Sequence, residues 1–528
     1  MCLTVPAPSI LIAGAAASGP VSGWGRLIGA SAALAVAEFA RQSDAPVLVL
    51  AEDPRHADLL EAEVRFFAGD DFPVWHFVEW ETLPWDSFSP HQDIISQRLT
   101  VLSMLPSLER GVVVASAPVL LQRLPPLNYV AARSLSLRTG QVLRREQFTE
   151  SLSETGYLRV PQVTEHGEFA VRGSLIDVFP MGSEHPVRID FFDDDIESLR
   201  YFSADSQRSG ETLESLDLLP AREVPLDPDA VRDFRARYRE RFEGQPGRSR
   251  VYRDVSDGIA HGGVEYYLPL FFEETAGLLD YLPRDCFVVA PTALDSVLER
   301  TWDEIAERHE LCSLDPERPV LDPGETFATT AAVLADLQSH LTVNISAQSL
   351  AEAPGVVNLP TRLPPAMKIE ARYEDPAGAL VAFLDEFEGR VLFTTDSPGR
   401  REQLFDLLAG RDLELARVES WADFVSTDRR IGIAIAPLEN GVLLADPDVA
   451  IISEQQLFGD RVRARSRRRR AERDPEAIIR QLDDLETGSP VVHAEYGVGR
   501  YIGLKTLEAG GITGEFLHLE YADGDKLY

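Results

Sequence analysis

The stretch from Glu165 to Ser203, EHGEFAVRGSLIDVFPMGSEHPVRIDFFDDDIESLRYFS, alternates between apolar and polar side chains over short runs. Neighbours i and i+2 of a β-strand share a face, so this alternation is typical of strands that bury one side. The sequence predicts four short strands here, with turns at Gly173, Met181–Pro186 and Asp193–Asp195. It therefore predicts a small β-rich unit.

The polar face of this predicted sheet carries side chains that a core does not need. Alternation places Arg172 on that face in the first strand, and Arg188, Asp190 and Phe192 on it in the third. Arginine and aromatic residues are enriched at the energetic centres of protein interfaces. The pattern alone leaves two interpretations open: a binding surface, or a solvated face with one exposed phenylalanine.

Predicted helices and strands alternate on both sides of this unit. Residues 24–42 and 54–67 have helical spacing of apolar side chains, and residues 46–53 and 111–118 form apolar runs of strand length. Such alternation predicts a parallel sheet with helices on both faces. The run CFVVAP at 286–291 continues the pattern beyond the β-rich unit, so we expect that unit to be an insertion.

The predicted fold class is α/β with several domains, because 528 residues suffice for three or four separate cores. The parts are an α/β domain, an inserted β-rich domain, a second small α/β domain, a basic linker or helix, and a strand-rich final block. Their predicted bounds are, in that order, 1–135 with 221–345, 136–220, 366–460, 461–485 and 486–528.

The opening of the chain has the glycines of a phosphate-binding loop: Gly14, Gly19, Gly23, Gly25 and Gly29. A working loop also needs a lysine to reach the phosphates and a hydroxyl for Mg²⁺. The chain has three lysines, and the first of them is Lys368. The sequence therefore predicts a nucleotide-binding type of fold that has lost ATP hydrolysis. We expect no catalytic residue, metal site or cofactor in this chain, and we interpret Glu454 at the end of a strand as structural.

Two features stand near the end of the chain. The basic run RVRARSRRRRAER at 461–473 is either a connector or a helix that contacts an acidic surface or nucleic acid. The block at 490–528 is rich in strands, and its Asp523-Gly524 pair is a hairpin signal, so we expect a small barrel. Because Tyr528 falls within a predicted strand, we expect an incomplete barrel and a longer parent protein.

Charge and composition limit the function classes. The formal net charge of −35 excludes a general coat for nucleic acid, which needs concentrated positive charge. Cys2, Cys286 and Cys312 are scattered and odd in number, which indicates a reducing cytoplasm. No apolar run has the length of a membrane helix. The sequence thus predicts a cytoplasmic protein that binds other proteins and no membrane.

Five stretches in a fixed order carry a specific resemblance to a known family. They are ETLPWDSFSPHQDIISQRL (81–99), EHGEFAVRGSLIDVFPMGSE (165–184), VRIDFFDDDIESLR (187–200), GVEYYLPLFF (263–272) and PVVHAEYGVGRYIGLKTLEAGGITGEFLHLEYADGDKLY (490–528). Together they resemble the N-terminal part of the bacterial transcription-repair coupling factor family. The resemblance covers nearly the whole chain.

The resemblance implies roles for the first two domains. The α/β domain is similar to a module of the excinuclease protein UvrB, here a degenerate P-loop or helicase-like domain that has lost nucleotide binding. The β-rich insertion is similar to the domain by which the family binds the excinuclease protein UvrA. Matching the motifs places that contact on Arg172, Arg188 and Phe192.

The final block is similar to the family's Tudor- or SH3-like barrel, which binds the β subunit of RNA polymerase. The implied contact residues are Tyr501, Ile502, Lys505 and Leu507, with Leu507 as the first choice. The full-length family is an ATP-dependent DNA translocase that uses ATP and Mg²⁺ and contacts DNA mainly through its motor domains. We expect that motor to lie beyond Tyr528.

Two alternative functions compete with this docking role. A damage-binding ATPase like UvrB conflicts with the missing lysine. It also conflicts with the segment ETLPWDSFSPHQ, which stands where that family's DNA-probing hairpin is expected. A transcription regulator that only contacts polymerase would leave the rest of the chain without a role.

Overall fold

The structure of this chain is a computed structural model. It describes residues 21–242, 244–315, 317–369, 377–408, 413–445, 448–459, 488, 490–493, 497–509, 512–521 and 526–527. These residues form a mixed α/β protein with several sheets, which confirms the general fold class. The chain divides into two compact units, one of Met1–Ala204 with Arg208–Arg461 and one of Asp205–Gln207 with Val462–Tyr528.

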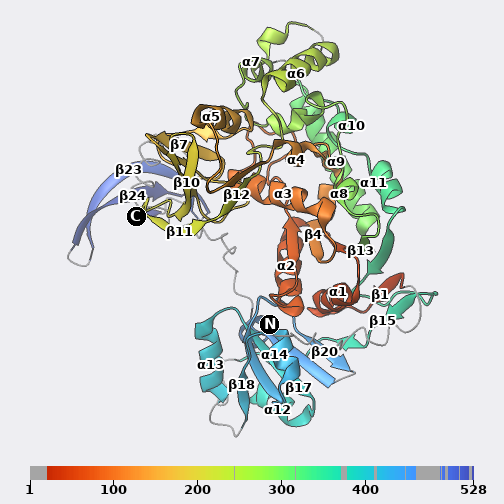
Figure 1. The fold of residues 1–528 in the computed structure, drawn as a ribbon. Coiled ribbons are helices and arrows are strands. Elements are labelled where there is room, and N and C mark those ends of the chain that lie inside the picture. Colours follow the sequence, from red (N-terminus) through yellow and green to blue (C-terminus); the bar gives the residue numbers. More distant parts are fainter. Residues whose placement is uncertain are drawn as a thin grey trace. The chain divides into compact units, whose positions relative to one another are not determined.

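A seven-stranded sheet, here called the large sheet, forms the centre of the first unit. Its order is β15-β1-β14-β13-β2-β4-β3, and all neighbouring strands are parallel. The strands are β1 (Gly23–Gly25), β2 (Val47–Ala51), β3 (Val74–Phe77), β4 (Val112–Ser116), β13 (Phe287–Pro291), β14 (Leu341–Ile345) and β15 (Val356–Asn358). Because β13 pairs with both β2 and β14, the segment between β4 and β13 is an excursion from one sheet (Figure 1).

Helices follow the strands of the large sheet. They are α1 (Ser31–Gln42), α2 (Pro54–Ala68), α3 (Gln92–Met104), α9 (Leu294–Cys312) and α11 (Thr330–Leu337), with the 3₁₀ segments η2 (Leu105–Ser107) and η3 (Ala117–Leu121). The helix predicted at 24–42 was wrong in its first part. Arg26 and Gly29 both have φ of +58°, which turns the chain between β1 and α1. The helix therefore begins at Ser31.

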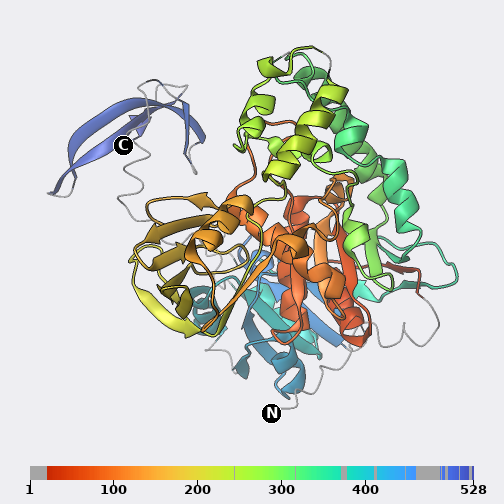
Figure 2. The same cartoon turned by 45° about the horizontal axis from the view of Figure 1, so that its top comes forward.

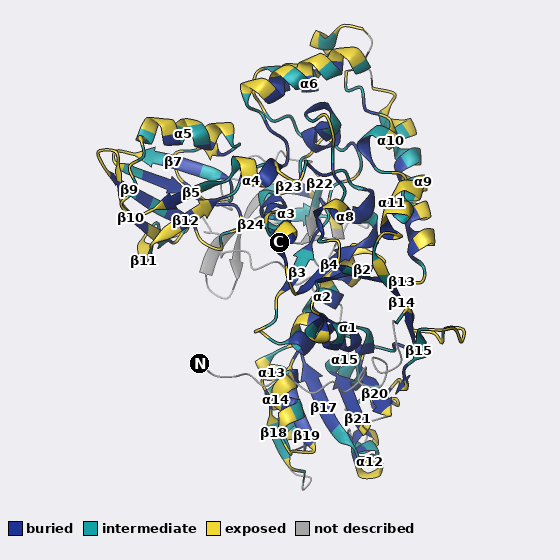
Figure 3. Cartoon of the chain, turned by 45° about the vertical axis from the view of Figure 1, so that its right-hand side comes forward, coloured by how far each residue is buried: buried dark blue, intermediate teal, exposed yellow. Residues whose placement is uncertain are grey.

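The excursion contains a six-stranded sheet, here called the insertion sheet, in the order β11-β10-β9-β8-β7-β6. Its strands are β6 (Leu158–Arg159), β7 (Glu168–Arg172), β8 (Leu175–Val178), β9 (Val187–Phe192), β10 (Asp195–Phe202) and β11 (Ser209–Leu213). Helix α5 (Arg145–Glu154) covers one face (Figure 3), where Phe148 and Phe191 lie 6.3 Å apart between ring centroids. The sheet therefore has one face packed on a core and one face without a helix.

Short elements connect the insertion sheet to the large sheet. Strands β5 (Leu135–Arg138) and β12 (Ser215–Leu218) pair in antiparallel fashion at its base, after helix α4 (Tyr129–Arg133). A helical part follows, with α6 (Pro228–Arg241), η4 (Pro246–Arg248), α7 (Arg250–Ser256), η5 (Val264–Leu270), α8 (Leu278–Tyr281) and α10 (Pro323–Thr326). Figure 2 shows α6 and α7 at one end of this unit. These two helices pack with η5 around their own apolar cluster, centred on Phe234 and Tyr238.

A second α/β sheet follows in the same unit, in the order β16-β20-β21-β17-β19-β18. Its strands are β16 (Thr361–Arg362), β17 (Arg390–Thr395), β18 (Leu415–Arg417), β19 (Ile431–Ile435), β20 (Val442–Ala445) and β21 (Asp448–Ser453). Its helices are α12 (Gly378–Glu386), α13 (Pro398–Leu408), α14 (Trp421–Ser426) and α15 (Glu454–Phe458). One apolar cluster joins this sheet to α1 and α2, so the two α/β parts share a continuous core.

The second unit contains an antiparallel sheet, here called the terminal sheet, in the order β22-β23-β24-β25. Its strands are β22 (Pro490–His493), β23 (Gly497–Ala509), β24 (Ile512–Glu520) and β25 (Lys526–Leu527). Within the described parts of the chain, no helix is long and apolar enough to cross a membrane.

Candidate docking surface

One face of the insertion sheet brings the three residues of the first prediction together. The strand register pairs Arg172 with Leu175, and Arg188 with Asp177. Residues directly opposite each other in a sheet share a face, so both arginines lie on the face that α5 does not cover. Phe192 lies on this face by alternation in β9, at the strand's end, and 70% of it is exposed. We call the face of the insertion sheet that carries these three residues the insertion face.

Phe192 is placed by a tight turn. Asp193 has a φ of +54°, a left-handed conformation that aspartate tolerates better than most residues. The chain reverses there, and Asp195 of β10 pairs with Phe192. The turn sets the backbone position of Phe192, and its exposed aromatic ring offers a large contact area.

Arg188 is held in one position rather than moving freely in solvent. Its Nε and one terminal nitrogen donate to the two carboxylate oxygens of Asp177 at 2.7 and 2.9 Å, and another nitrogen donates to Ser209 at 3.2 Å. Its guanidinium also lies over the ring of Phe202 at 4.8 Å. The hydrogen bond to Asp177 raises the pKa of Arg188 above its usual value. The side chain is only 17% exposed, so this arginine presents part of a fixed cation.

Asp177 is the residue that the pattern did not single out. Only 1% of its side chain is exposed, in a strand where Ile176 and Val178 are buried core residues. A buried carboxylate needs a paired cation, and Arg188 supplies it. The signal in the sequence was an acid inside an apolar strand, in register with an arginine of the next strand.

The insertion face is not polar throughout. A small apolar cluster of Val163, Ala170, Phe179 and Phe202 lies buried at one end of it. Arg172, which is exposed, donates a 3.0 Å hydrogen bond to the carbonyl oxygen of Pro161 in the segment leading into this cluster. The simple division into an apolar and a polar face was therefore wrong at this end, because the preceding loop folds over part of the sheet.

The residues expected to contact polymerase lie in the terminal sheet. Tyr501 is 7% exposed and pairs with Leu519, and its carbonyl accepts a 2.7 Å hydrogen bond from Gly488. Ile502 is partly exposed. Lys505 and Leu507 lie in β23, but their side chains lie outside the described residues. The basic run at 461–473 lies outside them as well.

Two further observations concern possible metal ligands and Glu454. Its described residues contain no group of three or more His, Cys, Asp or Glu side chains that could hold a metal ion. Glu454 accepts a hydrogen bond from the backbone of Asp396 at 2.9 Å and pairs with Arg400 at 3.0 Å, as a structural acid does.

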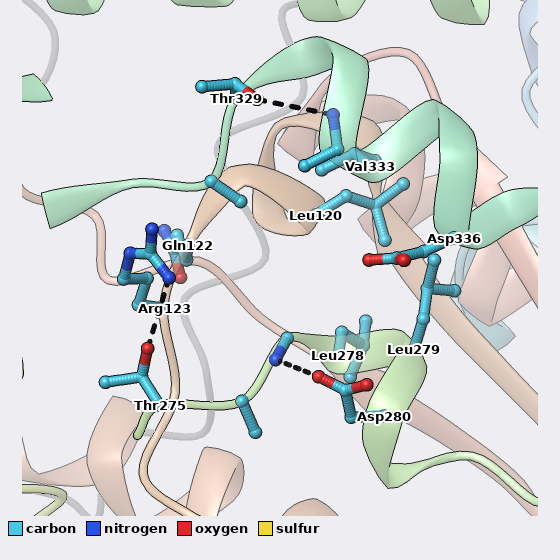
Figure 4. A pocket seen from close by; sticks show the side chains of 14 residues that line it. Leu120, Gln122, Arg123, Thr275, Leu278, Leu279, Asp280, Thr329, Val333 and Asp336 are labelled. Atoms are coloured by element: carbon cyan, nitrogen blue, oxygen red, sulfur yellow. Dashed lines mark hydrogen bonds between the residues drawn. The ribbon is translucent and has the colours of Figure 1, made fainter. Parts of the chain in front are cut away.

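A pocket of about 200 Å³ lies between η3, α8 and α11 (Figure 4). Arg123 on its wall donates to Thr275 and to the carbonyl of Gly324 at 3.2 and 2.9 Å. The opposite side carries Asp280, which accepts from the backbone of Gly277 at 2.8 Å, and Asp336. Two more lining side chains accept hydrogen bonds from helices: Gln122 from Arg98 of α3, and Thr329 from the backbone of Ala332 in α11.

Three family models match this chain. The model described as UvrB interaction domain matches residues 135–224, which include the insertion sheet. The model described as MFD, D3 domain matches residues 383–457 in the second α/β sheet. The model described as CarD-like/TRCF RID domain matches residues 485–528, a range that includes the strands of the terminal sheet.

Curated relatives match nearly the whole chain. The transcription-repair-coupling factor of Escherichia coli (strain K12) is 41% identical over 505 residues. The protein of the same name from Haemophilus influenzae is 38% identical over 506 residues. Each match covers 96% of this chain and 44% of the relative. The Bacillus subtilis protein of the same name is 29% identical over 462 residues. The chain thus spans less than half the length of these relatives. Along nearly its whole length, the chain is thus strongly homologous to the N-terminal part of proteins named transcription-repair-coupling factor.

Proposed function

We propose that this chain is the docking part of a transcription-repair coupling factor that acts in the cytoplasm. It binds the β subunit of stalled RNA polymerase through residues 486–528 and recruits the excinuclease protein UvrA through the insertion face. Its role is transcription-coupled nucleotide excision repair. The observation that carries the proposal is Phe192, an aromatic residue that is 70% exposed on the same sheet face as Arg172 and Arg188, inside the matched UvrB interaction domain.

The insertion face has the composition of a protein-binding centre. Arg172 is exposed, Arg188 presents a fixed cation, and Phe192 provides apolar area. Since the Asp177 carboxylate already holds Arg188 in place, binding costs little side-chain entropy there. A partner with a complementary acidic and apolar surface fits this face.

The terminal sheet supports the proposed polymerase contact. Residues 485–528 match a domain model named for CarD-like and TRCF RID proteins. We propose that this sheet is part of a Tudor- or SH3-like barrel and that Tyr501, Ile502, Lys505 and Leu507 mark the contact edge. The long strands β23 and β24 supply the paired framework from which such an edge can extend.

The large sheet is proposed to be a degenerate P-loop or helicase-like domain without ATPase activity. No lysine precedes Lys368, so the residue that would reach nucleotide phosphates is missing. We propose that this chain uses no cofactor. The ATP, Mg²⁺ and most DNA contacts of the full-length family then belong to a motor outside this chain.

Titration calorimetry of the whole chain with UvrA tests the docking face. Phe192→Ala is expected to weaken binding by at least ~2 kcal/mol, or roughly 30-fold, because the ring is a hot-spot candidate. Phe88→Ala is the matched control, since Phe88 is also 70% exposed but lies outside the insertion. The control should leave the affinity unchanged.

Equal affinities of Phe192→Ala and the unsubstituted chain would contradict the proposed site. Arg188→Glu is a poorer first test, because it places a second carboxylate against the buried Asp177 and disturbs the sheet itself.

A further inference from the structure

The corner between β1 and α1 has the topology of a phosphate-binding loop. Strand β1 ends at Gly25, the loop Arg26–Ala30 follows, and α1 begins at Ser31. In such a corner the loop amides and the first turn of the helix point at the phosphates. Whether a nucleotide can bind therefore depends on whether these amide groups already donate hydrogen bonds to other atoms.

Most of the loop amides already donate hydrogen bonds to oxygen atoms of the chain itself. The bonds run from Arg26 N to Gln348 O at 2.8 Å, Leu27 N to Ser346 O at 3.0 Å, Ile28 N to the Thr361 hydroxyl at 3.3 Å and Ala30 N to Asn440 O at 2.9 Å. Two of these acceptors, Thr361 and Asn440, come from the second α/β sheet and its loops. The donors that would bind phosphate are thus satisfied within the protein.

Gly29 shows how closely the second α/β part approaches. It has a φ of +58°, and a Cβ atom there would lie 2.3 Å from the carbonyl oxygen of Gly441 and 3.0 Å from that of Asn440. Only glycine permits this contact, for both conformational and steric reasons. The turn Glu439–Gly441, here called the plug turn, fills the space in front of α1.

The plug turn is fixed by its own domain and by the first. Ser453 donates to the carbonyl of Glu439 at 2.9 Å, and the amide of Gly441 donates to Gln456 at 3.1 Å. On the other side, the amide of Glu439 donates to Glu63 of α2 at 3.2 Å. Thus the turn is a rigid insert, with hydrogen bonds to both α/β parts.

Apolar packing surrounds the plug turn. Leu438 and Val442, which flank it, belong to the same buried cluster as Leu27 and Ala30 of the loop. Figure 1 shows α1 and α2 next to the second α/β sheet. Separating the two parts would expose this cluster to water, which is unfavourable.

We propose that the plug turn is an internal ligand of the β1–α1 corner and takes the place of nucleotide phosphates. The second α/β part thereby uses a former nucleotide site as its contact surface on the first α/β part. The missing lysine removes hydrolysis, whereas the plug turn removes the binding site itself. This role does not depend on the proposed partners of the chain.

Hydrogen exchange of the whole chain, followed by mass spectrometry, tests the contact between the plug turn and the β1–α1 corner. Peptides covering residues 24–31 and 437–443 should both exchange slowly in the unsubstituted chain. Gly29→Ala should speed both by at least ~10-fold, because the added methyl group expels the plug turn. Gly399→Ala is the control: Gly399 lies in α13 of the same part, and nothing lies within 4 Å of its added Cβ, so neither peptide should change.

A second pair of variants keeps the test valid if Gly29→Ala does not fold. Thr361→Val removes the hydroxyl that donates to Arg26 O and accepts from Ile28 N, and it should speed exchange of residues 24–31. Thr394→Val is its control, because the buried Thr394 hydroxyl has no hydrogen-bond partner. Unchanged exchange at 437–443 in a folded Gly29→Ala chain would overturn the proposal. Slower exchange of residues 24–31 on adding millimolar pyrophosphate to the unsubstituted chain would overturn it too.

Discussion

At the scale of single residues, a buried ion pair joins α3 to the segment that follows β12. Arg98 of α3 and Glu223, just after β12, are both fully buried and lie 2.6 Å apart. Arg98 also donates to the carbonyl of Val78 at 2.7 Å and lies over the rings of Phe77 and Trp80. A buried charge with this many partners is expensive to leave unpaired.

Glu223→Gln is expected to lower the unfolding free energy by about 3–5 kcal/mol, since it leaves the Arg98 cation buried without its counter-charge. Denaturant unfolding of the whole chain measures this. Asp229→Asn breaks the exposed pair with Arg232 and should cost less than ~1 kcal/mol. A similar small cost for both variants would contradict the expectation.

Glu265 makes stability depend on pH. Burial raises its pKa to about 7, while hydrogen bonds, including that from Ser89, oppose the rise. The folded state thus keeps a proton that the unfolded state loses near its ordinary value of 4.5. The stability from this protonation is complete below the unfolded pKa and is lost as the pH rises through 7.

Glu265→Gln removes this titration. Between pH 5 and pH 8 the stability of the variant, relative to the unsubstituted chain, should therefore rise by about 3 kcal/mol. Urea unfolding at several pH values measures the difference. A difference that stays constant or falls with rising pH would show that Glu265 is ionised in the fold.

At the scale of elements, α14 fastens the second α/β part to the first. Trp421, which is fully buried, packs against Phe67 of α2, with ring centroids 5.4 Å apart at 85°. Its neighbour Phe424 lies 5.7 Å away. The helix is short, so its place depends on this packing more than on its own helical propensity.

Trp421→Ala should destabilise the chain by about 3–5 kcal/mol, because it leaves a cavity between α14 and α2. Thermal or denaturant unfolding of the chain measures the loss. Phe88→Ala is again the control, since truncating an exposed ring away from packed elements should change stability by less than ~0.5 kcal/mol. Equal stability of the two variants would exclude a structural role for Trp421.

At the scale of the whole molecule, the two proposed docking regions belong to separate compact units. The insertion face lies in the unit that contains both α/β parts, whereas β23 lies in the other. Because the two proposed surfaces belong to different units, mutations in one surface are expected to leave binding at the other unchanged.

Leu507→Arg is expected to weaken binding to the β subunit of polymerase by at least ~2 kcal/mol and to leave binding to UvrA unchanged. Phe192→Ala should do the reverse. Pull-down and calorimetry with each partner separate the two effects. If either variant lost both partners, the surfaces would not be independent.

The sequence by itself determined the local features of this protein. Period-two alternation placed Arg172, Arg188 and Phe192 on one face, and the strand register agrees. The pattern also predicted the helix at 54–67, which is observed as α2 with one more residue at its end, since helical periodicity is a local property. The lack of an early lysine predicts that the chain has no working phosphate loop.

Only the tertiary structure decided which distant groups meet. Asp177 fixes Arg188, Glu223 neutralises Arg98, and the plug turn fills the corner before Ser31. Residues 24–30 have helical spacing, yet they form a strand and a turn, because contacts with distant loops stabilise Arg26 and Gly29 at positive φ. Local propensity contributes tenths of a kcal/mol per residue, whereas buried hydrogen bonds and packing contribute more. At residues 24–30, where two parts of the chain share one core, long-range contacts therefore override the local helical pattern.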